Sequence, residues 1–148
     1  MTLAVLNAGY IPLLDAAPLI VARDLGFAEE ERLALRLTPA PSWSTLRDML
    51  VFGQIEAAHM LAPVPVAMAL GLGGVATRVD AVQVLSVGGT VIGVSRALAA
   101  RMRGAGHGFD FADAGSAGRA LIAATGGRLR IGVPFPFSMQ AELMYFWL

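Results

Sequence analysis

Apolar runs of strand length alternate with helical patterns along the first half of the chain. Strands are predicted at residues 3–6, 33–37 and 55–58, and helices at residues 16–25, 45–52 and 63–70. Gly26 and Gly53 follow the first two helices, at the position where glycine commonly ends a helix. This alternation is the signature of βαβ units and predicts an α/β fold.

The loops that leave these three strands are the expected place for a binding site. They span residues 7–10, 39–43 and 59–63. Ligands of open α/β sheets bind outside the carboxyl ends of the strands. The three loops are therefore expected to converge on one site.

The second half of the chain has a similar but less regular pattern. Strands are predicted at residues 82–87, 91–94 and 129–133, and helices at residues 96–103 and 113–125. Gly88 and Gly89 separate the first two of these strands. Ser138 is expected to cap a last helix.

Residues 42–48 place polar and aromatic side chains at the start of a predicted helix. Ser42 or Ser44 can cap this helix, whose first turn leaves backbone N–H groups without intrahelical partners and carries the positive end of the macrodipole. A helix start of this kind binds anions. Trp43 would then line the mouth of an anion-binding cleft. The alternative is that Trp43 is a core aromatic and the serine an ordinary cap.

Three further side chains near this helix each have two interpretations. His59, after the predicted strand at 55–58, is either a core histidine with satisfied hydrogen bonds or a donor in the cleft. Arg47 and Asp48 are expected to form a structural ion pair or surface contacts in preference to contacts with a ligand.

Composition and charge exclude several classes of function. The net charge is zero, from 11 basic and 11 acidic residues, so nothing suggests nucleic-acid binding. Every basic residue is arginine and cysteine is absent, which removes lysine and thiol chemistry. His59 and His107 lie far apart in the sequence, and residues 71–74 lack the spacing of a phosphate-binding loop. We therefore expect no catalytic residue, no metal site, no cofactor and no enzymatic activity.

The sequence shows no membrane or export signal. Prolines and glycines interrupt the charge-free stretch at residues 57–77, which makes it a poor transmembrane helix. The N-terminus enters a strand directly, so the protein is expected to be cytoplasmic, or periplasmic if a leader was trimmed. The chain is 56% hydrophobic and stops within an apolar helical pattern at residues 145–148, which predicts the N-terminal part of a longer protein.

Several motifs occur in an order that is typical of one protein family. They are Tyr10-Ile11-Pro12-Leu13, Ala16-Ala17-Pro18, Ser42-Trp43, Arg47-Asp48, Ala57-Ala58-His59-Met60-Leu61-Ala62-Pro63, Gly71-Leu72-Gly73-Gly74, Ile92-Gly93-Val94-Ser95 and Gly132-Val133-Pro134-Phe135-Pro136-Phe137-Ser138. With them the chain resembles the nitrate and bicarbonate substrate-binding proteins of ABC-type uptake systems, and most of all their soluble nitrate-sensor relatives. The resemblance implies a two-lobed α/β fold of the periplasmic-binding-protein-like type II, with residues 1–85 as the first lobe and residues 86–148 as the start of the second.

The resemblance also implies a set of ligand-binding residues in a cleft between the lobes. They are Ser42, Trp43, Ser44, His59, Gly89, Thr90 and Gln140. Family members place an amide or similar polar group at the position of Thr90 and often a histidine at that of Gln140, so this chain departs from the pattern at both positions. The lysine that compensates the ligand's charge in the family would have to come from a part that follows these residues.

The function implied by the resemblance is that of a ligand sensor that regulates nitrate assimilation by binding nitrate or nitrite. Its partner would resemble a response-regulator-type antiterminator that is released when the ligand binds. The alternative is the substrate-binding component of an ABC transporter for nitrate, bicarbonate or a related anion, with permease subunits as partners.

Overall fold

The computed structural model describes residues 2–74 and 76–148, and the chain forms two compact units, Met1–Gly88 and Gly89–Leu148. We describe each unit by itself. The boundary lies close to the one expected after residue 85. The assignment of residues 1–85 and 86–148 to two lobes stays a prediction.

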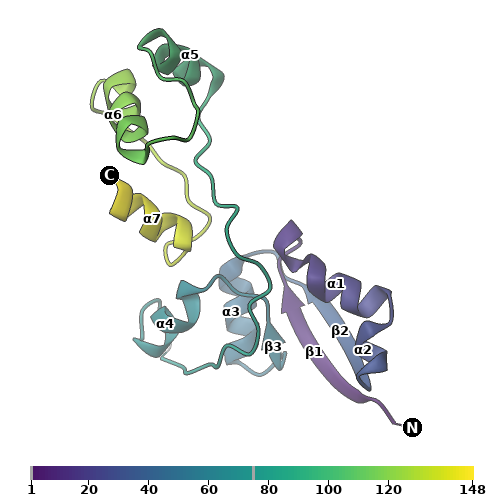
Figure 1. Ribbon diagram of the computed structural model, residues 1–148. Helices are drawn as coiled ribbons and strands as arrows, with labels where there is room; N and C mark the ends of the chain where they lie inside the picture. Colours follow the sequence, from purple (N-terminus) through teal and green to yellow (C-terminus); the bar gives the residue numbers. More distant parts are fainter. Residues whose placement is uncertain (1, 75) are drawn as a thin grey trace. The chain divides into compact units, whose positions relative to one another are not determined.

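The first unit is a mixed α/β structure with a small parallel sheet (Figure 1). Its strands are β1 (Ala4–Tyr10), β2 (Leu33–Pro39) and β3 (Ala57–Ala58), in the spatial order β2-β1-β3. The other elements are the 3-10 turn η1 (Leu14–Ala16) and the helices α1 (Ala17–Asp24), α2 (Phe27–Glu30), α3 (Trp43–Val51) and α4 (Pro63–Ala69). β1 pairs with β2 along its whole length, and Ala8 and Gly9 of β1 pair with the two residues of β3.

Every helix and strand predicted for this unit is present, with shifted ends, and α2 is an additional short helix. Gly26 and Gly53 have φ angles of +82° and +70°, which are left-handed values that glycine adopts without strain. They follow α1 and α3, as the sequence predicts. The helix predicted at residues 16–25 begins as η1 and continues as α1.

Gly9 allows α3 to pack directly on the sheet. A Cβ atom at position 9 would lie 2.5 Å from Leu46 Cδ1 and 2.6 Å from Ile55 Cδ1. Leu46 and Ile55 form the buried core of this unit with Ala40, and Trp43 packs against that core. The hydrogen atom that replaces a side chain at Gly9 therefore sets how closely α3 approaches the ends of the strands.

The second unit contains the helices α5 (Arg96–Gly104), α6 (Ala114–Thr125) and α7 (Met139–Trp147), all as predicted from the sequence. Each is capped by a side-chain oxygen that accepts a hydrogen bond from a backbone N–H of the first turn; the caps are Ser95, Asp113 and Ser138. Trp147 connects α7 to α6, because its Nε1–H donates to the carbonyl of Ala114 at 2.8 Å.

The strands predicted at residues 82–87, 91–94 and 129–133 are wrong. These segments have no regular secondary structure and pair with no strand among the residues that the structure describes. Val82 is 90% exposed and Val87 is 88% exposed. Valine-rich runs have the propensity of strands, but a strand forms only where a neighbour supplies a hydrogen-bonding ladder and an apolar face.

Candidate functional site

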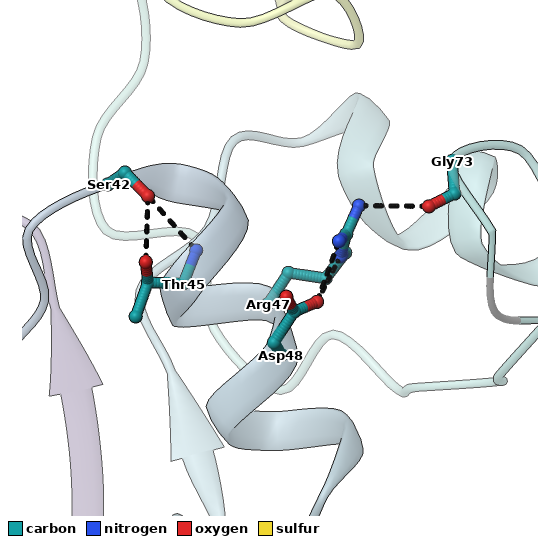
Figure 2. Close-up of polar contacts among 5 residues, drawn as sticks. All are labelled: Ser42, Thr45, Arg47, Asp48 and Gly73. Carbon is teal, nitrogen blue, oxygen red and sulfur yellow. Dashed lines mark hydrogen bonds and ion pairs between the residues drawn. The ribbon is translucent and has the colours of Figure 1, made fainter.

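Ser42 caps α3 and thereby defines the start of the helix (Figure 2). Its Oγ accepts a hydrogen bond from the backbone N–H of Thr45 at 3.1 Å and lies 2.9 Å from Thr45 Oγ1. Ser44 lies inside the first turn, so Ser42 is the cap. Since the first N–H groups of a helix have no intrahelical acceptor, those of Trp43 and Ser44 remain available to an anion.

His59 lies just after β3, at the carboxyl end of the parallel strands. Its backbone N–H donates to the carbonyl of Gly9 at 2.9 Å, which ties it to the end of β1. The side chain is only 6% exposed, and Nε2 lies 3.3 Å from Asp15 Oδ2. Asp15 belongs to η1, which follows β1. Two strand ends therefore bring an imidazole and a carboxylate together.

The indole ring of Trp43 contacts the imidazole of His59. The two ring centroids are 5.4 Å apart and the ring planes are inclined at 60°. Trp43 is half-buried and packs against the core of the unit, as the core interpretation expects. A place for Trp43 at the mouth of an anion-binding cleft stays a prediction. We call Asp15, Trp43 and His59 the strand-end cluster.

Two polar atoms of the strand-end cluster are buried without a hydrogen-bond partner among the described residues. They are His59 Nδ1 and Asp15 Oδ1. An unsatisfied buried polar atom costs about 1–3 kcal/mol, and most such atoms in proteins are paired with protein groups, water or a ligand. The cluster therefore has hydrogen-bonding capacity to offer to a bound molecule.

Arg47 and Asp48 form an ion pair on α3, which confirms the structural interpretation (Figure 2). Arg47 Nη2 lies 2.6 Å from Asp48 Oδ1, and Arg47 Nη1 donates to the carbonyl of Gly73 at 3.3 Å. The arginine side chain is 19% exposed. The hydrogen bond to Gly73 thus links α3 to the loop after α4, and the positive charge of Arg47 is paired with Asp48.

Three of the predicted site residues belong to the second unit. Gly89 and Thr90 are exposed at its start, and Gln140 lies in the first turn of α7. Gln140 Oε1 is buried and has no hydrogen-bond partner among the described residues. The structure brings Trp43 and His59 together and places Ser42 and Ser44 at the start of the same helix. A shared site with Gly89, Thr90 and Gln140 stays a prediction.

Asp15 is the member of the strand-end cluster that the sequence reasoning missed. It follows a loop that leaves β1, so its position after a predicted strand end was a usable signal. An acidic residue next to prolines and alanines resembles an ordinary turn, and its contact with His59 arises only when β1 and β3 pair.

The part of the chain that the structure describes contains neither a candidate metal site nor a candidate membrane-spanning helix. Residues 2–74 and 76–148 contain no group of three or more His, Cys, Asp or Glu side chains that could hold a metal ion. No helix within the same residues is long and apolar enough to cross a membrane.

The sequence profile of the NMT1-like family, which is of the periplasmic-binding-protein type, matches residues 3–148. No solved structure matches the chain.

Three named relatives illustrate the similarity. The chain is 34% identical over 145 residues to the nitrate import ATP-binding protein NrtC of Synechococcus elongatus, which covers 95% of this chain and 20% of that protein. It is 40% identical over 68 residues to the nitrate/nitrite binding protein NrtA of Synechocystis sp., covering 43% of this chain and 15% of NrtA. It is 30% identical over 105 residues to the bicarbonate-binding protein CmpA of Synechococcus elongatus, covering 67% of this chain and 23% of CmpA. The chain thus spans about a fifth of the length of these curated relatives.

Proposed function

Because the chain belongs to the NMT1-like family, we propose that it binds a small oxyanion, nitrate or nitrite, without changing it chemically. The observation that carries this proposal is the contact between Trp43 and the buried His59 at the start of the capped helix α3. The names of the relatives NrtA and CmpA support an anion as the ligand class.

The start of α3 and the ring of Trp43 support the binding of a planar oxyanion. The indole face of Trp43 is a flat platform, and the N–H groups of Trp43 and Ser44 are donors at the positive end of the α3 macrodipole. Ser42 acts by holding that helix end in place. Gly89, Thr90 and Gln140 are kept as candidate ligand contacts on the strength of the family resemblance.

We propose that anion binding serves as a sensor signal. In this role the ligand changes the affinity of the protein for a regulatory partner resembling a response-regulator-type antiterminator, in the cytoplasm. Such a signal requires that the ligand bind two conformations of the protein unequally.

A role as the substrate-binding component of an ABC transporter for nitrate, bicarbonate or a related small anion is the second candidate. The observation in its favour is the name of NrtC, a nitrate import ATP-binding protein whose similarity covers 95% of this chain. We do not propose that this chain binds ATP. It contains no lysine and therefore lacks the lysine of a P-loop. Permease subunits would then be the partners.

Calorimetry with Trp43→Ala tests anion binding. Sodium nitrate, nitrite, bicarbonate and chloride are titrated into the wild-type chain and the variant. We expect nitrate or nitrite to bind, and Trp43→Ala to weaken binding by about 1–3 kcal/mol, roughly 5- to 150-fold, without unfolding the protein. Trp147→Phe is the matched control, because it removes the tryptophan of the other unit. An unchanged dissociation constant in folded Trp43→Ala would overturn the assignment.

The two roles differ in the partner that responds. The sensor role predicts a complex with an antiterminator that nitrate dissociates and that Trp43→Ala leaves intact but unresponsive. The transport role predicts that adding the protein stimulates the ATPase activity of reconstituted permease and ATP-binding subunits. Stimulation without any antiterminator complex would replace the sensor role.

A further inference from the structure

The pairing of β3 with β1 is short. Two residues of β1, Ala8 and Gly9, pair with the two residues of β3, whereas β2 pairs with β1 along its whole length. So short a strand contributes few ladder hydrogen bonds, and it needs further contacts to keep its register. His59 follows β3 directly. A contact that fixes the register of β3 therefore also fixes the position of His59.

Glu56, which immediately precedes β3, supplies such contacts, and all of them go to Asn7 of β1. The backbone N–H of Glu56 donates to the carbonyl of Asn7 at 2.9 Å. In return, Glu56 Oε2 accepts a hydrogen bond from the backbone N–H of Asn7 at 2.7 Å, and Oε1 accepts one from Asn7 Nδ2 at 3.3 Å. Hydrogen bonds to a carboxylate are shorter and stronger than those between neutral groups.

The carboxylate of Glu56 takes the place of a strand carbonyl. In a parallel ladder whose neighbouring step is the bond from the N–H of Glu56, the N–H of Asn7 would donate to the carbonyl of Gln54. Gln54 still belongs to the turn after α3, since its own N–H donates to the carbonyl of Met49 at 2.8 Å. The side chain of Glu56 thus extends the pairing of β3 by one step beyond the strand itself.

The other end of β3 is held by His59, whose backbone N–H donates to the carbonyl of Gly9 at 2.9 Å. The contacts of Glu56 and of His59 therefore fix the two ends of the strand on the same side of β1. The ring of His59 then lies 5.4 Å from the ring of Trp43, measured between centroids. A slip of β3 by one residue would turn its side chains to the opposite face and break this ring contact.

We propose that Glu56 is the positioning residue of the strand-end cluster: its carboxylate fixes the register of β3 on β1 and thereby holds the ring of His59 against Trp43. Glu56 acts through β3 and touches no ligand itself. The inference rests on the proposed function for its consequence in anion binding, because the contact between Trp43 and His59 carries that proposal. The structural part is tested separately.

Amide hydrogen exchange of the 148-residue chain tests the positioning, because β1 has a matched reporter on each side. The N–H of His59 donates to β1 on the β3 side, and the N–H of Ala40 donates to the carbonyl of Tyr10 at 2.8 Å on the β2 side. We expect Glu56→Ala to accelerate exchange at His59 by about tenfold or more and to change exchange at Ala40 by less than about twofold.

The ring contact is measured in the same variant by NMR. Nuclear Overhauser effects between the indole protons of Trp43 and the imidazole protons of His59 should be present in the wild type and weakened or lost in Glu56→Ala. A general loss of stability would not move this signal in the protein that remains folded, whereas a displaced β3 would.

A conservative variant and a matched control complete the series. Glu56→Gln keeps an acceptor for the N–H of Asn7 but loses the charge and the second acceptor. We expect it to retain the ring contact and to accelerate exchange at His59 by about threefold, between wild type and Glu56→Ala. Glu30→Ala removes an exposed carboxylate from α2 of the same unit and should change neither reporter. If Glu56→Ala fails to fold, the comparison of His59 with Ala40 in Glu56→Gln decides instead.

The outcomes separate this inference from the proposed function. Equal acceleration at His59 and Ala40, or an unchanged ring contact, would mean that Glu56 contributes only to general stability, and the inference would be wrong. Calorimetry with sodium nitrate is run on the same variants. Absence of nitrate binding to the wild type would overturn the proposed function, while exchange and ring contact still decide the role of Glu56. Unweakened nitrate binding to Glu56→Ala that has lost the ring contact would support the positioning role and remove His59 from the anion site.

Discussion

The two units of this protein differ in how they bring residues together. In the first unit, the parallel sheet gathers Asp15, Trp43 and His59 from three separate segments to one end of the strands. In the second unit, capped helices contact one another and leave large side chains such as Phe111 and Tyr145 about nine-tenths exposed. The parallel sheet brings polar side chains together at the carboxyl ends of its strands, whereas the helical unit exposes apolar side chains.

The helical unit contains an apolar hollow near its C-terminus. It is an apolar groove of about 530 Å³ lined by Ile131, Val133, Pro136, Ala141, Met144, Tyr145 and Leu148. No charged side chain lines this groove, in contrast to the carboxylate and imidazole of the strand-end cluster.

Removal of a core leucine is expected to give the largest effect and tests whether the units are independent. Leu46→Ala should destabilise the first unit by about 2–5 kcal/mol, because Leu46 is fully buried under the sheet. Leu121→Ala is the matched substitution in the second unit, where Leu121 is 3% exposed. Urea unfolding, followed separately through Trp43 and Trp147, should show each loss in its own unit. Equal losses of unfolding free energy at Trp43 and Trp147 would show that the two units do not unfold independently.

Gly9→Ala is expected to have the next largest effect, about 1–3 kcal/mol. The new Cβ would push against Leu46 and Ile55 and move α3 away from the strand ends. Gly93→Ala is the control, since a Cβ there meets nothing within 4 Å. Thermal unfolding measures the loss, and calorimetry should show weaker nitrate binding at Gly9→Ala. Nitrate affinity equal to wild type would show that the spacing between helix and sheet does not matter to the site.

The cap of α3 gives a smaller effect that sharpens the assignment of the helix start. Ser42→Ala should cost about 0.5–2 kcal/mol, because the N–H of Thr45 loses its acceptor. Ser44→Ala should be close to neutral, since Ser44 lies within the helix. Denaturant unfolding of the two variants measures the difference, and a larger cost at Ser44 would mean that the helix starts later than described.

The smallest effect is a pH dependence confined to the second unit. The N–H of Ser116 donates to the Asp113 side chain and, with a smaller contribution from Arg119, holds the pKa of Asp113 below its usual value of 3.8. The charged cap therefore stabilises α6 above that pH, and the contribution disappears as the pH falls through the lower value of the folded state. Acid titration of the Ser116 amide signal should show this loss in the wild type and not in Asp113→Asn.

The sequence predicted most of the first unit because its signals are local. Gly26 and Gly53 mark helix ends through their left-handed conformations, and Ser42 marks a helix start through a hydrogen bond three residues away. Each of these features depends on a few neighbouring residues, so it can be read without knowing the rest of the fold.

The failures concern contacts between distant residues. Val82–Val87 has strand propensity but finds no partner strand in the described residues, and propensity carries no information about partners. Asp15 and His59 come into contact through the pairing of β1 with β3, which no local sequence pattern predicts. The contact between Trp43 and His59 was expected only as a convergence of loops, because the position of the two rings depends on how α3 packs on the sheet.

The sheet order β2-β1-β3 has a consequence for the kinetics of folding. The strand that is synthesised first is the central one, so β1 cannot complete its pairing until β3, about fifty residues later, has left the ribosome. Both pairings are parallel and non-local, and contacts of that kind form slowly. During this interval β1 can pair with β2 on one side but has no strand on its other side, whereas α5 and α6 lie close in sequence and can associate as soon as they are made. The unit that carries the proposed anion site is therefore expected to mature more slowly than the helical unit, although its chain is synthesised first.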